Sequence, residues 1–424
     1  MDFMYDFIVI GAGISGASFA YKASKYAKTL LVEAQDYDRE IPVRTNIFAE
    51  HNKPFVDDLF WNDDSIFPRP FVQLNYKSEK HDGLLHSKEF GAPLGKISHT
   101  EILIKKLIDK FRDQGGTTQF SESIAKIERH SDHIEVINNK GESFSTKLLV
   151  LATGSRGFPL QKSLGFEIPD SSMGIYTNIY ADESLLEENF NFQYMFHLNP
   201  KISQNGPFFF NVGKGRIATG YLGNKENPAE LKSKLIRILK NYQKIQPFMK
   251  GIKWDESIPF VSGGISKHPI SSFSKDRVIV LGEAAGLVTA FFYEGILCGL
   301  ASADIAATLL KTLLADNSNF SRAELKKYDD EVARVLFTYF RNGNACEYLF
   351  YNESSSTKTL WNSYSNLLNT NKTVRKYVYE AHINQDLSKH NTDNDRFVGE
   401  KLFATIPVLS KMTLWPKFLK AMSF

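Results

Sequence analysis

Glycines near the start of the chain are spaced for binding phosphate groups. The run Gly11-Ala12-Gly13-Ile14-Ser15-Gly16 follows an apolar segment, Tyr5–Ile10, and precedes a helix-like segment. Glycine at the first of its three positions permits a tight turn, at the second lets the backbone approach a pyrophosphate, and at the third lets the helix pack closely on the strand. The unpaired N–H groups at the helix start favour anions. The run predicts a dinucleotide site, and the alternative is a glycine-rich turn in an ordinary α/β domain.

A carboxylate follows at the sequence spacing that is typical of ribose binding. Glu33 ends the second apolar segment, Leu30–Glu33, 17 residues after Gly16, and Ala34 comes next. A carboxylate at this place accepts hydrogen bonds from ribose hydroxyls, and it repels a 2′-phosphate. The pattern therefore disfavours NADP at this site.

Two later segments repeat the arrangement of an apolar strand that stops at glycine. Leu148–Ala152 leads into Thr153-Gly154, and Val278–Leu281 leads into Gly282-Glu283-Ala284-Ala285-Gly286. Small residues at a helix start let its N–H groups touch a phosphate or a cofactor ring, and Glu283 can accept a bond from a hydroxyl. Taken alone, the last string is also explained by a strand–turn–helix whose Glu283 is an N-terminal helix acid. The three junctions lie about 130 to 140 residues apart, and their order predicts one shared site.

The composition narrows the class of protein. The chain has 424 residues, of which 42% are hydrophobic, and this length suits two or three interwoven domains. A net charge of +3 gives no reason to expect a nucleic acid as partner. Two cysteines, Cys298 and Cys346, are too few for a disulfide framework or a metal cage, and the ten histidines lack metal-ligand spacing. We therefore expect no metal.

The elements that position these residues are predicted from periodicity. Short runs that are apolar on both faces suit a parallel sheet covered by helices, whereas residues 172–265 alternate as an antiparallel sheet with one wet face. Ser98–Gly115 repeats at helical spacing, with Ser98 as N-cap and Glu101 completing a capping box. We expect an α/β, two-domain (α+β) protein with three parts: a Rossmann-like domain from residues 1–40, 98–160 and 266–315, an inserted substrate domain from 41–97 and 161–265, and a helical C-terminal region, 316–424.

Two segments bear on localisation. The apolar window Ala284–Ala303 is long enough to cross a bilayer, but its glycines and the charge of Glu294 favour a buried helix, and a strand replaces the apolar core of a signal peptide. We expect a soluble, cytoplasmic protein. Lys401–Phe424 interleaves apolar residues with lysines, which indicates either peripheral contact with a membrane or an amphipathic tail packed on the core. Pro407 and Pro416 are expected to break this segment into short pieces.

Together the three junctions resemble the FAD-dependent superfamily with the p-hydroxybenzoate-hydroxylase fold, and within it the geranylgeranyl reductase family. Two further strings support that branch: the glycine pair in Val261–Ile265, and Glu294-Gly295-Ile296, which is similar to the family's G-E-G-I helix start. The resemblance covers about residues 1–315. It implies tightly held FAD and the reduction of isoprenoid double bonds. The FAD contacts that it implies are Gly11, Gly13, Ile14, Ser15, Gly16, Glu33, Ala34, Arg44, Ala152, Thr153, Gly154, Gly282, Glu283, Ala284, Gly286, Gly295 and Ile296.

The chain departs from the reductases at three places. In their P-x-R-C-G-E string, Pro42 and Arg44 are kept but Thr45 stands where the cysteine would be, so any role of that cysteine is lost or altered. Residues 208–215 lack the Trp and Pro of the family's substrate string. Phe291-Phe292-Tyr293 is bulkier than the glycine-rich turn of the family, and it is expected to narrow the pocket on one flavin face. The sequence supports the flavin part of the resemblance better than the substrate part.

The chemistry that this implies needs an electron donor and a proton donor. No second G-x-G-x-x-G occurs, so NAD(P)H or a redox protein is expected to bind transiently. N–H groups of Gly286 and Gly295 are expected near the flavin N1–O2 edge, where a helix dipole stabilises the reduced anion. The candidates for proton delivery to an apolar substrate are Thr45, Tyr293 and Glu294, and the alternative role of Glu294 is a structural helix cap.

Two other activities stay open. One is a flavin monooxygenase or halogenase that acts on a small aromatic molecule. The strings typical of hydroxylases are replaced at Thr153-Gly154 and at Gly282–Gly286, and the W-x-W-x-I-P string of halogenases does not occur. The other is a non-redox FAD protein such as a cyclase. Net electron flow and oxygen consumption separate these activities from a reductase.

Overall fold

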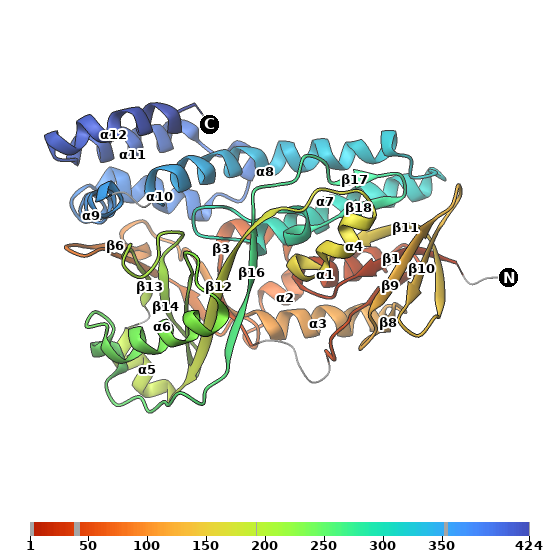
Figure 1. Ribbon diagram of the computed structural model, residues 1–424, viewed down its shortest axis with the longest axis horizontal. Coiled ribbons are helices and arrows are strands. Elements are labelled where there is room, and N and C mark those ends of the chain that lie inside the picture. Colours follow the sequence, from red (N-terminus) through yellow and green to blue (C-terminus); the bar gives the residue numbers. More distant parts are fainter. Residues whose placement is uncertain (1–3, 38–42, 192, 352–354, 424) are drawn as a thin grey trace.

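The computed structural model describes residues 4–37, 43–191, 193–351 and 355–423. Figure 1 shows two sheets at opposite ends of the molecule, with a layer of helices from the second half of the chain along one side. One sheet contains the N-terminal strand, and the other is built mainly from residues 170–267. The fold class that the sequence predicts, an α/β protein with two sheet-based parts, is confirmed.

The first sheet is the parallel sheet that the glycine junctions predict. Its central strands are adjacent and parallel and have the order β18-β11-β1-β2-β8, with bounds Val278–Val280, Ser143–Leu151, Tyr5–Ile10, Thr29–Val32 and Thr117–Gln119. A two-residue strand β17 (Ser274–Lys275) and the antiparallel strands β9 (Ile124–Arg129) and β10 (Ile134–Asn138) extend it.

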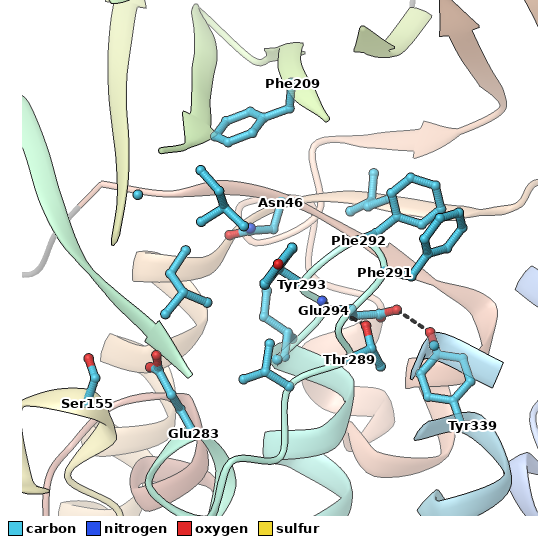
Figure 2. Close-up of a pocket in the computed structure, with 18 of the residues that line it drawn as sticks. Asn46, Ser155, Phe209, Glu283, Thr289, Phe291, Phe292, Tyr293, Glu294 and Tyr339 are labelled. Carbon is cyan, nitrogen blue, oxygen red and sulfur yellow. Dashed lines mark hydrogen bonds between the residues drawn. The ribbon is translucent and has the colours of Figure 1, made fainter. Parts of the chain in front are cut away.

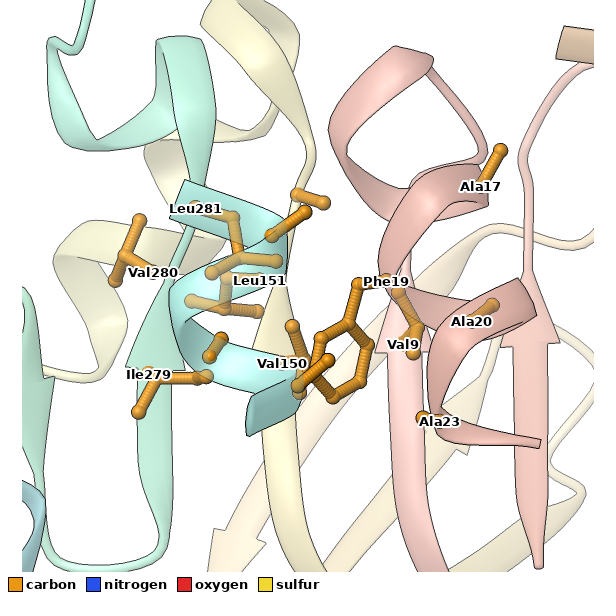
Figure 3. Packing of buried hydrophobic residues seen from close by; sticks show 14 of the residues in the cluster. Val9, Ala17, Phe19, Ala20, Ala23, Val150, Leu151, Ile279, Val280 and Leu281 are labelled. Carbon is orange, nitrogen blue, oxygen red and sulfur yellow. The ribbon is translucent and has the colours of Figure 1, made fainter. Parts of the chain in front are cut away.

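The core of this sheet is apolar on both faces. Helix α1 (Ile14–Ala23) follows β1 directly and buries Ala17, Phe19 and Ala20. Figure 3 shows Phe19 of α1 beside Val9 and Val150 of the two central strands. Small side chains on α1 let helix and strand approach closely, which brings the start of α1 up to the carboxyl ends of the strands.

The second sheet has seven strands in the order β16-β12-β15-β14-β13-β5-β6. Their bounds are Phe260–Lys267, Asp170–Tyr180, Arg216–Leu222, Phe208–Gly213, Gln193–His197, Gln73–Lys77 and Asp82–His86. Neighbours are antiparallel, as predicted, except β13 and β5, which are parallel. Helices α5 (Glu183–Phe190) and α6 (Pro228–Asn241) accompany it, and a small sheet of β3 (Thr45–Ala49), β7 (Gly95–His99) and β4 (Arg69–Phe71) links the two parts.

The remainder of the chain is helical, as predicted. The helices are α7 (Ile296–Ala315), α8 (Arg322–Phe350), α9 (Ser355–Thr370), α10 (Lys372–Ile383), α11 (Thr392–Thr405) and α12 (Val408–Ala421). Among the described residues, α7 is the one helix long and apolar enough to span a membrane, and 67% of its apolar window is buried inside the protein. It begins 12 residues after the start of the window Ala284–Ala303, because a short 3-10 turn and a loop occupy the first part of that window.

Two local predictions are wrong. Ser98 is not a helix N-cap: it belongs to strand β7, its hydroxyl donates to the Asn46 carbonyl, and helix α3 (Thr100–Asp113) begins after His99. Pairing of β7 with β3 extends the chain through Ser98, so local capping preference is overridden. Pro416 does not break the C-terminal segment, because α12 continues through it, whereas Pro407 does separate α11 from α12.

The predicted three-part division stays a proposal. Its boundary at residues 40 and 41, like Pro42, lies outside the described residues. The apolar clusters also cross the predicted boundaries: Phe60 and Phe67 pack with the first sheet, and so does the first half of α8 through Tyr328 and Leu336. The end of α8 belongs instead, through Leu349 and Phe350, to the apolar cluster that includes Leu74 and Leu85 of the second sheet.

Candidate active site

The three glycine junctions meet at the carboxyl ends of the strands of the first sheet. The Ala152 amide donates to the Ile10 carbonyl (2.8 Å), and the Leu281 amide donates to the Leu151 carbonyl (2.8 Å). The ends of β1, β11 and β18 therefore lie in one row. The 3-10 turns that follow β11 and β18, Gly154–Gly157 and Gly282–Ala285, contact each other. Residues about 130 to 140 apart in the sequence are thus brought to the carboxyl end of a parallel sheet, where ligands of such sheets bind.

The glycines of the first junction have different physical roles. Gly11 has a φ of +101°, and a Cβ there would lie 2.4 Å from the Ala152 carbonyl oxygen. A Cβ on Gly16 would lie 1.9 Å from the Gly11 carbonyl oxygen, so this glycine permits the helix to pack on the strand. Gly13 is different, because its φ is −66° and a Cβ would meet no atom within 4 Å. The absence of a side chain at Gly13 keeps open space in front of α1.

Charged side chains surround that open space. The Glu33 carboxylate accepts from the Ala12 amide (2.8 Å) and from the Gln35 amide (2.9 Å), which fixes it beside the glycine run. The charges of Glu33, Arg44 and Arg156 all act on Tyr37, so both guanidiniums lie near this carboxylate. Burial raises the pKa of Tyr37, and both guanidiniums oppose that rise. A ligand here would meet a carboxylate suited to sugar hydroxyls and two cations suited to phosphates.

A single cavity of about 1990 Å³ joins these residues. This volume is about twice the upper end of the range of about 300–1,000 Å³ for a single-ligand pocket. Most of the predicted site residues line it: Gly11, Gly13, Ile14, Ser15, Glu33, Ala34, Arg44, Thr45, Ala152, Thr153, Gly154, Glu283, Tyr293, Glu294, Gly295 and Ile296.

Four predicted contacts, Gly16, Gly282, Ala284 and Gly286, do not line the cavity. A Cβ on Gly282 would lie 2.2 Å from the Ser15 hydroxyl oxygen, and a Cβ on Gly286 would lie 2.2 Å from the His268 carbonyl oxygen. The Gly286 amide already donates to the Glu283 carbonyl (3.0 Å). The expectation that the Gly286 N–H faces the cofactor is therefore wrong, because this glycine serves the packing of the junction.

The glycine pair of β16 lies over the second and third junctions. The Ser155 hydroxyl donates to the Gly264 carbonyl (2.9 Å), and the Ser266 amide donates to the Glu283 carboxylate (3.1 Å). Figure 2 shows Ser155 and Glu283 together at this end of the cavity. Burial raises the pKa of Glu283 above its ordinary value, against the opposing effects of the Ser266 amide and the charge of Arg44.

Glu294 forms a polar cluster in the cavity wall with two residues that the sequence did not single out, and its side chain is 25% exposed. Its carboxylate lies 3.1 Å from His51 Nε2. It also accepts a hydrogen bond from the Tyr339 hydroxyl (2.6 Å), which Figure 2 shows. Burial alone would raise the pKa of Glu294, but His51 and Tyr339 lower it to about 2. Glu294 is therefore an anion near neutral pH. Helix α7 has Gly295 as its N-cap and no side-chain cap bond, so the alternative role of Glu294 as a helix cap is wrong.

Tyr293 precedes this cluster in the chain and has an unusual backbone conformation. Its φ of +55° is in the left-handed region, which is uncommon for a bulky residue and marks functional or strained positions. The residue lines the cavity, and its hydroxyl is buried beside the Ser172 side chain. Burial raises the pKa of this hydroxyl. Tyr293 thus keeps its proton near neutral pH.

Thr45 is fixed by a hydrogen bond to a charged side chain. Its hydroxyl oxygen accepts from Arg216 Nε (2.6 Å), and the same guanidinium forms an ion pair with Glu101 (2.9 Å). Glu101 also accepts from the Arg44 amide (2.9 Å). Glu101, which was predicted to complete a capping box, instead fixes the segment that carries Arg44 and Thr45.

We expect Thr45→Val to lower the free energy of unfolding by about 1–2 kcal/mol, because one buried hydrogen bond to Arg216 is lost while side-chain shape is kept. Urea unfolding measures this change. Thr45→Ser retains the hydroxyl and serves as the matched control. Equal stability of Thr45→Val and the wild-type protein would show that the Arg216 bond contributes nothing.

Aromatic side chains form the wall opposite the junctions. Phe292 stacks on Phe196 of β13 (ring centroids 4.8 Å apart), and Phe291 stacks on Trp361 of α9 (5.8 Å). Phe209 of β14 also faces the cavity (Figure 2). The bulky run Phe291–Tyr293 therefore lines the cavity, and it joins the antiparallel sheet to the C-terminal helices. This part of the cavity suits an apolar ligand.

One surface group outside the cavity has the composition of a metal site. Ligand atoms of Glu128, His130 and Glu135 on the β9–β10 hairpin lie within 4.8 Å of one another. None of the three lines the cavity. His130 and Glu135 also form an ordinary ion pair at 3.6 Å, and the expectation of no metal stays a prediction.

Comparison with known proteins agrees with the motifs. No protein-family profile matches the chain. Digeranylgeranylglycerophospholipid reductase from Methanococcus vannielii is 25% identical over 80% of this chain and 84% of its own length, and the enzyme of that name from Methanocaldococcus jannaschii is 25% identical over 77% and 81%. The resemblance to geranylgeranyl reductases is thereby confirmed.

Solved structures show the same fold. A geranylgeranyl bacteriochlorophyll reductase-like protein from Thermoplasma acidophilum has a TM-score of 0.69 and 17% identity, and the match covers 92% of this chain and 99% of that chain. The p-nitrophenol 4-monooxygenase from Pseudomonas putida also has a TM-score of 0.69, with 14% identity over 92% of this chain and 100% of that chain. Identities this low show the fold alone.

Proposed function

We propose that the protein is an FAD-dependent oxidoreductase that reduces carbon–carbon double bonds of an apolar, isoprenoid-type substrate. The observation that carries the proposal is one continuous cavity, with three glycine junctions at one end and an aromatic wall opposite. The names of the two curated relatives, reductases of a lipid with geranylgeranyl chains, support this substrate class.

The residues present fit FAD. Open space at Gly13 and the uncapped N-terminus of α1 suit a pyrophosphate, and the fixed Glu33 carboxylate suits a ribose. The Thr153 hydroxyl is buried at the cavity wall without a hydrogen-bond partner in the described part of the chain, which leaves it for a ligand. When bound, FAD supplies hydride chemistry, and the protein supplies position and electrostatics.

The chain's own residues hold the substrate and control protons. The N-terminus of α7, at Gly295 and Ile296, lines the cavity and presents the positive end of its dipole, which favours negative charge on a ligand. Aromatic side chains exclude water from the opposite wall. Of the three proton-donor candidates, Tyr293 suits the role best because its hydroxyl keeps its proton, whereas Glu294 is an anion and Thr45 is engaged by Arg216.

The protein also needs an electron donor and access to its substrate. A second glycine-rich nucleotide motif is absent from the sequence, so we infer that the electron donor, NAD(P)H or a redox protein, binds transiently. A cytoplasmic location with peripheral membrane contact fits a lipid substrate. The shared fold of a monooxygenase keeps oxygen-dependent hydroxylation as the second candidate function.

An anaerobic reoxidation experiment tests the proposal. FAD-loaded protein is reduced with dithionite without oxygen and is then mixed with a geranylgeranyl lipid dispersed in detergent. We expect the flavin absorbance to return and mass spectrometry to show two added hydrogens for each reduced double bond. Flavin that stays reduced until oxygen and a small aromatic molecule are added would overturn the proposal in favour of a monooxygenase.

A further inference from the structure

The last helix of the described chain carries two adjoining apolar seams, one buried and one exposed. Leu414, Phe418 and Ala421 of α12 are buried against the protein. A second seam lies on solvent, and α12 is an outermost helix of the molecule (Figure 1). Its members are spaced at i, i+4, i+7, i+11 and i+14, which is one face of a helix, and their exposed fractions run from 46% to 76%: Val408, Met412, Trp415, Leu419 and Met422. A soluble surface helix needs only the first seam.

The charges around this exposed seam are positive. Helix α12 contains Lys411, Lys417 and Lys420 and no acidic residue. The Lys411 ammonium donates to the Ala404 carbonyl at the end of α11 (3.1 Å), and the Lys420 ammonium lies 4.9 Å from the centre of the Tyr348 ring. Apolar side chains with lysines beside them are the composition of helices that lie in the interface of an anionic membrane.

The cavity of the candidate active site reaches the same helix. Trp415, Phe418 and Met422 line it, and so do Leu349 of α8 and Leu402 of α11. Trp415 is 49% exposed and Met422 is 67% exposed, so these two side chains face both solvent and the cavity. The cavity therefore has a mouth at α12.

We propose that the exposed seam of α12 docks on a membrane that contains anionic phospholipid, and that the apolar chain of the substrate enters the cavity from the bilayer through the mouth at Trp415 and Met422. The second part rests on the proposed function, and the first does not. A bilayer fits better than a second copy of this chain, because two copies of α12 would bring lysines together and Pro416 interrupts the backbone hydrogen bonds of the helix.

Vesicle flotation of the FAD-loaded protein tests the docking. The probes are vesicles of phosphatidylcholine alone and of phosphatidylcholine with phosphatidylglycerol. We expect the wild-type protein to float with the anionic vesicles, and the double variant Met412→Gln/Leu419→Gln to bind them more than about tenfold more weakly, since two apolar side chains no longer enter the interface. Leu59→Gln is the matched control, because Leu59 on α2 (Asp58–Trp61) is 60% exposed and distant in sequence from the cavity mouth.

Two further measurements separate the outcomes. Light scattering of the wild-type protein and the double variant shows whether the seam is a dimer interface, and FAD content with detergent-dispersed substrate shows whether the proposed function holds. Equal flotation of the double variant and the wild type, no flotation of the wild type, or a dimer that the double variant dissociates would each overturn the docking. If one of these results is found while the substrate still reoxidises the flavin normally, only the docking proposal is overturned and the proposed function stands.

Discussion

We expect Gly13→Val to weaken FAD binding at least about a hundredfold, which corresponds to about 2.8 kcal/mol, while the apoprotein stays folded. A side chain at this position meets no protein atom within 4 Å, and the φ of −66° is accessible to valine. The valine would instead occupy the space in front of α1 where a pyrophosphate would lie. Fluorescence titration of the apoprotein with FAD measures the loss, and thermal unfolding of the apoprotein measures the fold.

Gly16→Val is the matched comparison three residues away. A Cβ there would lie 1.9 Å from the Gly11 carbonyl oxygen, so this variant is expected to fail by unfolding rather than by losing a ligand contact. The two variants therefore separate a glycine kept for a ligand from a glycine kept for packing. Unchanged FAD affinity in a folded Gly13→Val protein would contradict the placement of the pyrophosphate.

Replacement of Glu294 by glutamine is expected to lower the free energy of unfolding at pH 7 by about 3 kcal/mol, because the carboxylate loses the interactions with His51 and Tyr339 that hold its pKa low. The folded-state pKa of Glu294, about 2, is below the ordinary value of about 4.3 for glutamate. A lowered pKa contributes stability that is fully present above the ordinary value and is lost as the pH falls towards 2. The stability difference between the wild-type protein and the variant should therefore shrink between pH 5 and pH 3.

Urea unfolding at several pH values measures both effects. Asp330→Asn is the control for removal of one carboxylate, since Asp330 forms an exposed i,i+4 pair with Lys326 and is expected to contribute less than about 1 kcal/mol. Tyr339→Phe, which removes one hydrogen bond to Glu294, should cost about 1–2 kcal/mol. A Glu294→Gln protein as stable as the wild type at pH 7 would show that the Glu294 carboxylate contributes nothing to the free energy of unfolding.

The first sheet and the glycine junctions could be predicted because each rests on local chemistry. Gly16 and Glu33 have roles set by their neighbours in one strand–helix–strand unit, and a parallel sheet brings the ends of its strands together. The order of the junctions in the sequence was enough to expect one site. Gly286 was misassigned because packing on His268 and contact with a cofactor both call for a small residue there.

The Glu294 cluster could not be predicted, since its members lie far apart in the sequence. His51 is 243 residues from Glu294, and it lies in a 3-10 helix without a recognisable motif. The predictions of a helix N-cap at Ser98 and of a helix break at Pro416 were wrong for a related reason. Strand pairing with β3 and the tertiary packing of α12 override the local preferences of these residues. The cavity mouth depends on helices 100 residues away from the last glycine junction, so only the folded chain shows it.

The stoichiometry of FAD tests the central claim most directly. The purified wild-type protein, reconstituted with FAD and freed of excess cofactor, is denatured, and the released flavin is quantified by chromatography against the protein. One FAD per chain, with the flavin spectrum lost in Gly13→Val, is the predicted result. A colourless protein that retains no FAD after reconstitution would contradict the assembly of the three glycine junctions around a single cofactor.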